Sequence, residues 1–231
     1  MSETERDIGM AVWAGTFASA AMIAHQMAGK ATRDALFLST YGYASLPAMV
    51  IAAAIVSLFL AGVASRVAGR FEPGRIVPLV FGISAVLTLV EWSLLSVDRG
   101  AVAVMVYLHL TGLGALLVSG FWSILSERFD PRSAKRYITK IAAGGTVGGL
   151  LGGVLAERIA AMFSIEAMFP LLAFLHVVCA VLTRRLGRGE ESPALTAEFK
   201  HRSSQNEVGI NVLRRSPYLT TIGALIFLTA L

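Results

Sequence analysis

Residues 101–125 read AVAVMVYLHLTGLGALLVSGFWSIL, and this stretch decides the fold class of the chain. It contains no Asp, Glu, Lys or Arg and exceeds the roughly 20 apolar residues that a helix needs to cross the bilayer core. Inside that core every backbone N–H and C=O group must be hydrogen-bonded within the protein. The stretch is therefore expected to be a transmembrane helix.

Further apolar stretches on both sides of it approach the same length. The chain of 231 residues is 55% hydrophobic and 15% charged, whereas a soluble domain is about a quarter charged. The alternating strands of a membrane β-barrel are absent from the sequence. We predict an all-α integral membrane protein in contact with the lipid bilayer. The expected crossings are 8–27, 44–63, 76–95, 101–125, 137–156 and 163–182, followed by the start of a seventh near Tyr218.

The placement of Lys and Arg predicts the orientation of these crossings. Sixteen of the 20 basic residues fall on the side that holds the N-terminus, where the positive-inside rule places the cytoplasm. The acidic segment 1–7 does not match the start of a signal peptide, so the first crossing is expected to be retained. The basic residues on the opposite side are Lys30, Arg33, Arg99 and Arg158.

Several function classes are disfavoured. The net charge of +5 is concentrated in loops between apolar blocks, which argues against nucleic acid as a partner. Cys179 is the only cysteine, so neither a disulfide nor a CxxC pair can form. No residues have the spacing of a metal site or form a nucleophile–base pair. We expect no metal, no cofactor and no enzymatic activity.

The chain is expected to contain three segments. Residues 1–186 form six crossings, 187–215 form a basic cytoplasmic linker, and 216–231 begin a seventh crossing. This layout is typical of the midpoint of a major-facilitator-type transporter, which has two six-helix halves. The seventh segment would extend about 21 Å at 1.5 Å per residue, too short to cross the bilayer. A C-terminal half is therefore an expected partner.

The first candidate site consists of Gln26, Lys30, Arg33 and Asp34, at the expected end of the first crossing. Spacings of three and four residues place side chains on one helical face. Arg and Lys suit phosphate binding, and cations beside an apolar span often mark a functional path. The alternative interpretation is a helix end whose cations snorkel to the lipid headgroups beside a local Arg33–Asp34 pair.

The second candidate site consists of Glu127, Lys135 and Arg136, at the cytoplasmic edge of the fourth and fifth crossings. These opposite charges suggest a gating latch that breaks and re-forms as the helices rock. Positive-inside topology, with Trp122 in an aromatic belt, explains the same residues without a mechanism. Both interpretations stay open.

Three isolated ionisable residues, Glu91, His109 and His176, lie within crossings. Each is a candidate for a proton relay. The default expectation for both histidines is a hydrogen bond to a neighbouring helix.

A glycine ladder in the fifth crossing predicts close helix packing. Small residues four apart let a second helix approach. A phosphate-binding glycine loop would need a preceding strand, which a membrane helix cannot supply. The ladder consists of Gly144, Gly145, Gly148, Gly149, Gly152 and Gly153.

Several motifs together resemble the ATP/ADP translocase-type nucleotide transporters of intracellular bacteria and plastids. The segment KATRD at 30–34 matches a basic-x-x-basic-Asp motif, and Leu-Pro at 46–47 matches the start of the second helix. The segment FWSILSE at 121–127, followed by AKRY at 134–137, is the most specific match. Ser126 stands where that family has Asn, and Arg33 where Lys is usual.

The resemblance implies a major-facilitator-like fold and a bacterial inner membrane location with a cytoplasmic N-terminus. It also implies transport of a nucleotide or another phosphorylated anion, with substrate-binding residues Gln26, Lys30, Arg33 and Asp34. Two alternatives remain. One is a carrier of an unrelated substrate, proton-coupled through Glu91 or a histidine, and the other is a membrane scaffold or sensor that does not transport.

Overall fold

The computed structural model describes residues 3–68, 71–129, 131–187 and 221. The chain divides into two compact units, Met1–Ser192 and Pro193–Leu231, and the fold described below is that of the first unit. The expected linker beyond Gly187 lies outside the described residues, as does the expected seventh crossing apart from Thr221.

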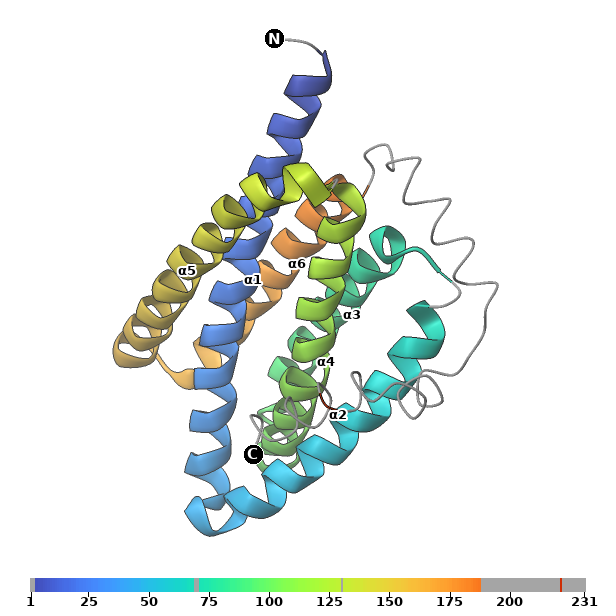
Figure 1. Ribbon diagram of the computed structural model, residues 1–231. Coiled ribbons are helices and arrows are strands. Elements are labelled where there is room, and N and C mark those ends of the chain that lie inside the picture. Colours follow the sequence, from blue (N-terminus) through green and yellow to red (C-terminus); the bar gives the residue numbers. More distant parts are fainter. Residues whose placement is uncertain (1–2, 69–70, 130, 188–220, 222–231) are drawn as a thin grey trace. The chain divides into compact units, whose positions relative to one another are not determined.

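Six long helices make up the first unit, and the described residues contain no strand (Figure 1). All six are long and apolar enough to cross a membrane, which makes the chain an all-α, multi-pass membrane protein. Short 3₁₀ turns at Tyr43–Ser45 and Ile165–Ala167 precede the second and sixth helices. The helices are α1 (Glu3–Tyr41), α2 (Leu46–Ala68), α3 (Pro73–Leu94), α4 (Arg99–Arg128), α5 (Pro131–Met162) and α6 (Met168–Leu186).

The expected end of the first helix is wrong. Instead of ending near Met27, α1 continues to Tyr41, so the first candidate site lies inside the helix. The polar residues lower the local hydropathy, but Ala, Gln, Lys and Arg are all good helix formers. The turn comes at Gly42, whose φ of 72° favours glycine. At 1.5 Å per residue, α1 is about 58 Å long, well beyond the thickness of a bilayer core.

The two central helix beginnings are set by local chemistry. Asp98 precedes α4 and accepts a hydrogen bond from the backbone N–H of Ala101 at 2.9 Å, which is the geometry of an N-cap. Pro73 occupies the first turn of α3, where its missing N–H leaves no hydrogen bond unmade. A salt bridge between Arg99 and Glu166 joins the start of α4 to the 3₁₀ turn before α6.

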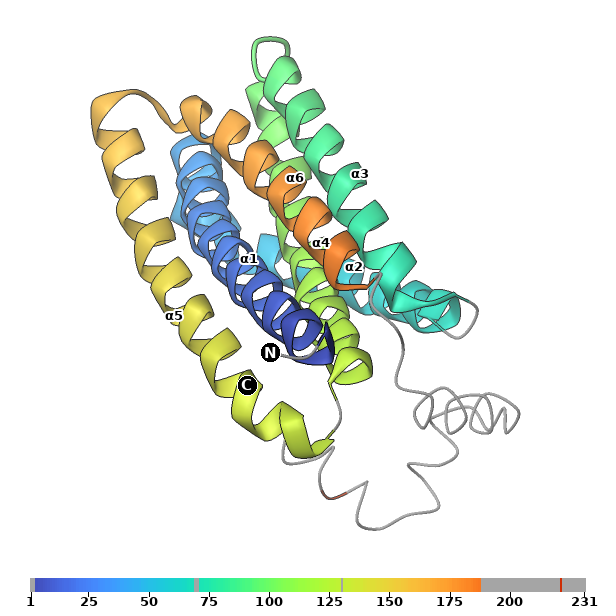
Figure 2. The same ribbon diagram turned by 90° about the horizontal axis from the view of Figure 1, so that it is seen from above.

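Helix α1 lies at the centre of the packing. It contacts α5 most extensively and also packs against α6 and α4, while α3 packs against α6 and α4 (Figures 1 and 2). By contrast, α2 packs mainly against α4 and diverges from the other helices after the turn that follows α1. The residues that line the cavity beside α1, and the polar side chains that hydrogen-bond across the buried interior, come from α1, α3, α4 and α6.

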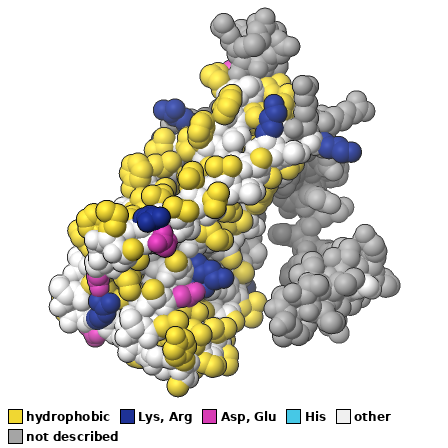
Figure 3. Space-filling model, turned by 90° about the vertical axis from the view of Figure 1, so that its left-hand side faces the viewer, with side chains coloured by type: hydrophobic (Ala, Val, Ile, Leu, Met, Phe, Trp, Pro, Cys, Tyr) yellow, Lys and Arg dark blue, Asp and Glu magenta, His cyan; other side chains and the backbone are white. Residues whose placement is uncertain are grey.

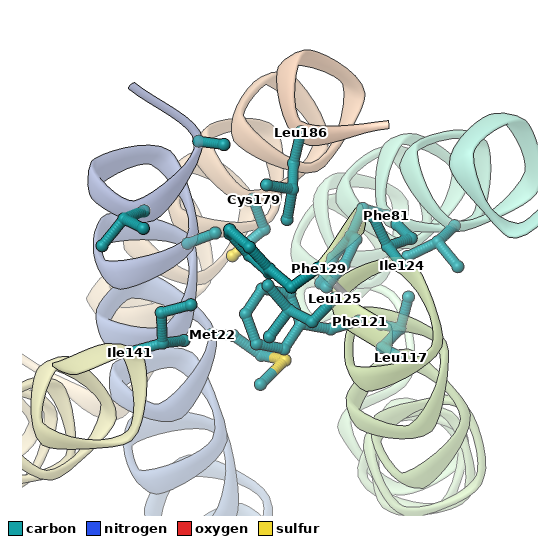
Figure 4. Close-up of a cluster of buried hydrophobic side chains, with 14 residues drawn as sticks. Met22, Phe81, Leu117, Phe121, Ile124, Leu125, Phe129, Ile141, Cys179 and Leu186 are labelled. Carbon is teal, nitrogen blue, oxygen red and sulfur yellow. The ribbon is translucent and has the colours of Figure 1, made fainter. Parts of the chain in front are cut away.

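Two large hydrophobic clusters fill the interior along the helices. The first brings together side chains from α1, α3, α4, α5 and α6, including the fully buried Phe81 and Phe121 (Figure 4). The second lies further along α1 and includes Leu36, Val106 and Phe169. Hydrophobic side chains cover much of the outer surface in Figure 3, as expected for side chains that face lipid, while charged side chains lie near the top of the view and in its lower half.

The glycine ladder of α5 lies against the backbone of α1. A β-carbon at Gly144 would come within 2.7 Å of the Thr16 carbonyl oxygen. At Gly148 and Gly152 it would meet the Cα atoms of Ala20 and Ala24 at 2.5 and 2.6 Å. Real β-carbons do not approach other atoms this closely, so these positions require glycine.

The other three glycines of the ladder are less constrained. A β-carbon at Gly145 would lie 2.8 Å from the Ser19 hydroxyl, and one at Gly149 would lie 3.1 Å from the Cγ2 methyl of Ile23. At Gly153 it would meet nothing within 4 Å. Backbone contact therefore runs along the 144, 148 and 152 edge of α5.

Candidate functional site

A small cavity beside α1 gathers most of the first candidate site. Its volume is about 100 Å³, and its lining includes the side chains of Gln26, Lys30 and Arg33. Leu110 of α4 forms part of the opposite wall, and His25 also lines the cavity. We call this feature the cationic cavity, because two of its lining residues carry positive charge.

Arg33 is held by contacts with its own helix and with α4. Its Nε lies 3.0 Å from a carboxylate oxygen of Asp34, and its guanidinium donates a hydrogen bond to the Thr111 hydroxyl. The guanidinium carbon also lies 4.7 Å from the centre of the Tyr107 ring, a cation–π contact. The Arg33 side chain is only 16% exposed, so it does not snorkel freely at a lipid interface.

Gln26 and Lys30 are placed differently. The Gln26 side-chain amide donates a hydrogen bond to the carbonyl oxygen of Gly114 at 3.2 Å, which ties α1 to α4. A β-carbon at Gly114 would come within 3.0 Å of that amide, so the absence of a side chain there makes room for Gln26. Lys30 is exposed, and the described residues offer it no ion pair.

The structure describes only part of the second candidate site. Glu127 lies in the last turn of α4 and lines a larger cavity, of about 1170 Å³, formed by α3, α4 and α6. Arg75, Arg128 and Arg184 line the same cavity, whose remaining walls are mostly apolar. Lys135 is exposed in the first turns of α5, and the side chain of Arg136 lies outside the described ones. The gating latch remains a prediction.

A continuous set of hydrogen-bonded polar side chains crosses the interior of the bundle. Two of its members belong to α3, one to α4 and one to α6. Both carboxylate oxygens of Glu91 lie 3.0 Å from Nδ1 of His109. Nε2 of His109 lies 2.7 Å from the hydroxyl of Ser84, and that hydroxyl lies 3.1 Å from Nε2 of His176. Glu91, Ser84 and His176 are each only 1% exposed.

His25 of α1 extends this set to the cationic cavity. Its ring centre lies 3.7 Å from that of His176, and the two rings are tilted by 40°. Nε2 of His25 and Nδ1 of His176 are both buried without a hydrogen-bond partner among the described residues. Together Glu91, His109, Ser84, His176 and His25 form what we call the buried polar chain.

Sequence reasoning found part of this arrangement. The expected hydrogen bond to a neighbouring helix is confirmed for His109 and His176, since both bond to Ser84 of α3. The expectation that Glu91, His109 and His176 are isolated from one another is wrong, because a series of hydrogen bonds through Ser84 joins all three. Ser84 and His25 were missed, although His25 had the same signal as the other histidines, an ionisable residue within an apolar helix.

The two features have different chemical capacities. The cationic cavity offers Arg33, which Asp34 neutralises, Lys30, which has no ion pair in the described part of the chain, and the Gln26 amide. This set suits an anionic oxygen ligand. The buried polar chain offers groups that exchange protons, while the described residues contain no group of side chains able to hold a metal ion. No protein-family model, curated protein or solved structure matches this chain.

Proposed function

We propose that this chain is the six-helix part of a membrane transporter that moves a phosphorylated anion, such as a nucleotide, by alternating access. The observation that carries the proposal is the cavity beside α1, a helix long and apolar enough to cross a membrane, which Gln26, Lys30 and Arg33 line together. Charged side chains within membrane spans are costly, and those beside an internal cavity commonly mark a substrate path. On the positive-inside rule, the N-terminus of this transporter is cytoplasmic.

The charge balance of the cavity supports an anionic ligand. Asp34 neutralises Arg33 at 3.0 Å, which leaves Lys30 as the source of net positive charge. A phosphate group would bind Lys30 directly and would compete with Asp34 for the planar donors of Arg33. Asp34 is thus an internal competitor of the ligand, and its removal is expected to strengthen anion binding.

The size of the cavity limits what it can hold. Pockets for drug-sized ligands enclose about 300–1,000 Å³, whereas this one encloses about 100 Å³. It accommodates a phosphate-sized group, so the remainder of a nucleotide would lie outside it. We therefore expect inorganic diphosphate to compete with a nucleotide for the same side chains.

Binding to the purified full chain in detergent tests the proposal. Ligand-dependent thermal shifts with ADP, ATP and inorganic diphosphate should be present in the wild type and lost in Lys30→Gln and Arg33→Gln. Asp34→Asn should give a shift at lower ligand concentration, because the competing carboxylate is gone. This opposite sign separates a ligand site from a general loss of stability.

A matched control is available on α5. Arg158 pairs with its sequence neighbour Glu157 at 3.3 Å, as Arg33 does with Asp34, but its side chain is 71% exposed. Arg158→Gln should leave the ligand-dependent shift unchanged. Equal shifts in the wild type, Lys30→Gln and Arg33→Gln would contradict the proposal. Uptake of another solute without phosphate binding would favour a carrier of an unrelated substrate, and no uptake would favour a scaffold.

A further inference from the structure

We infer that the buried polar chain is a proton relay, which takes up a proton at the edge of the cationic cavity and stores it on the Glu91–His109 pair. The inference rests on the proposed function only in treating that cavity as the substrate site. The groups concerned are almost fully enclosed, with Glu91 1% and His109 8% exposed. An ionisable pair inside a membrane bundle is expensive to bury, so its retention calls for a role.

The hydrogen bonds of the chain have a single direction when Glu91 is ionised and the histidines are neutral. A carboxylate only accepts, so Nδ1 of His109 carries the proton and donates to Glu91. Nε2 of His109 is then an acceptor, and the Ser84 hydroxyl donates to it. The Ser84 oxygen in turn accepts from Nε2–H of His176. In this arrangement Nδ1 of His176 has a bare lone pair.

The unpartnered nitrogens lie at the end of the chain nearest the cavity. Among the described residues, Nδ1 of His176 has no hydrogen-bond partner, and neither has Nε2 of the adjacent His25. A buried polar atom without a partner costs about 1–3 kcal/mol. His25 lines the cationic cavity, so it is the residue through which a proton enters. Passage from His25 to His176 takes place across their ring contact, by rotation of the His25 ring or through one bridging water.

One added proton then reverses the direction of the hydrogen bonds between His176, Ser84 and His109, and it leaves His25 and His176 neutral. An N–H bond forms at Nδ1 of His176 as its Nε2–H proton passes to the Ser84 oxygen. Ser84 gives its original proton to Nε2 of His109, which now carries two protons beside the Glu91 carboxylate. His109 can pass its Nδ1 proton on to Glu91, which gives two neutral partners. In both forms the net gain is one proton, held by the Glu91–His109 pair.

Few other ionisable groups face the buried polar chain. On α1 these are Lys30 and Arg33, which line the cavity that His25 also lines, and Asp34, which pairs with Arg33. On α6 the buried Cys179 follows His176 by one turn. Glu91 is the only charged or histidine residue of α3 after Arg75. His109 is the only one of α4 between Arg99 and Glu127. The part of α5 at 148–152 that packs on α1 is Gly and Leu only.

The relay also accounts for the position of the cationic cavity. A proton held on His25 adds positive charge beside Lys30 and Arg33, and an anion in the cavity favours that proton. Passing the proton to His109 and Glu91 removes the added charge from the cavity. Loading of the anion and movement of the proton are thereby linked through His25.

Nitrogen-15 NMR of the full chain, labelled at histidine and without any phosphate ligand, tests the relay. At high pH, His109 should carry its proton on Nδ1 and His176 on Nε2. As the pH is lowered and the buried polar chain takes up one proton, the His176 proton should move to Nδ1 while His109 gains a proton on Nε2. If His176 keeps its proton on Nε2 throughout, or if His109 and His176 change independently, the relay is overturned.

Variants of Ser84 provide the second arm. Ser84→Ala should uncouple the two histidines, so that His109 protonates without a tautomer change at His176, whereas Ser84→Thr, which keeps the hydroxyl, should restore the coupling. Ser93→Ala removes an exposed hydroxyl of α3 that bonds only to the Val90 carbonyl oxygen, and it should match the wild type. Coupling that persists in a folded Ser84→Ala would refute the relay. Because no phosphate is present, these results are independent of whether the cavity binds an anion.

Discussion

A single methyl group at Gly148 should weaken the contact between α1 and α5. The added β-carbon would lie 2.5 Å from the Cα atom of Ala20, whereas carbon atoms pack best at about 3.5–4.0 Å. The nearest atom is the Ala20 carbonyl oxygen, which would lie closer still, so the two helices must separate by at least about 1 Å at this point. A gap of that size forfeits between a quarter and a half of the dispersion energy of each affected contact. Gly144 and Gly152 share the interface, so the loss extends along it.

The magnitude is best measured as a difference from a second glycine of the same helix. Replacing Gly by Ala in a helix interior adds about 1 kcal/mol of intrinsic stability at either position. Gly153→Ala should gain this helix stability without a steric clash, because nothing lies within 4 Å of the new carbon. Subtraction leaves the steric cost of Gly148→Ala, which we expect to be about 1–3 kcal/mol. Gly149→Ala should fall between them, since its nearest neighbour is the Ile23 Cγ2 methyl at 3.1 Å and not backbone.

The assay is equilibrium unfolding in mixed micelles containing a graded fraction of sodium dodecyl sulfate, followed by loss of helical circular dichroism. The expected order of stability is Gly153→Ala, then Gly149→Ala, then Gly148→Ala. Equal free energies of unfolding for Gly148→Ala and Gly153→Ala would show that α1 and α5 do not meet along this edge.

Two further predictions concern the loop between α3 and α4. Asp98→Ala removes the cap that accepts from the Ala101 N–H, and it should lower the free energy of unfolding by about 0.5–2 kcal/mol; Asp98→Asn should restore most of this loss, and equal stability of all three proteins would argue against the cap. A cysteine in place of Val97, which is 79% exposed, should react with an impermeant thiol reagent outside intact cells. A cysteine at position 203, outside the described residues, should not, and the buried Cys179 is not expected to interfere. Reaction at 203 but not at 97 would reverse the orientation.

The six crossings in the described part of the chain could be predicted from the sequence because each transmembrane helix satisfies its own backbone hydrogen bonds. The end of α1 could not be predicted in the same way. Hydropathy falls at Gln26, Lys30 and Arg33, but a helix continues wherever its residues favour it and neighbouring helices cover it. Contacts with Thr111 and Tyr107 of α4 supply that cover for Arg33.

The sites depend on contacts between distant parts of the chain. The spacing within α1 predicted that Gln26, Lys30 and Arg33 share a face, since helical periodicity is local. The buried polar chain joins Ser84 to His176, which lie 92 residues apart, and no local pattern encodes that contact. The glycine ladder predicted close packing, but only the position of α1 in the structure shows that the 144, 148 and 152 edge of α5 makes the contact.

The divergence of α2 from the other helices implies that stability is unevenly distributed along the chain. Only 11% of the most apolar 18-residue stretch of α2 is buried, against 44% of the corresponding stretches of α1 and α4. Few buried contacts mean that a segment opens at a small free-energy cost compared with the rest of the protein. Detachment of α2 would leave the cationic cavity and the buried polar chain intact, since neither includes a residue of α2. The bundle can thus change its outline on one side while the groups that handle charge stay in place.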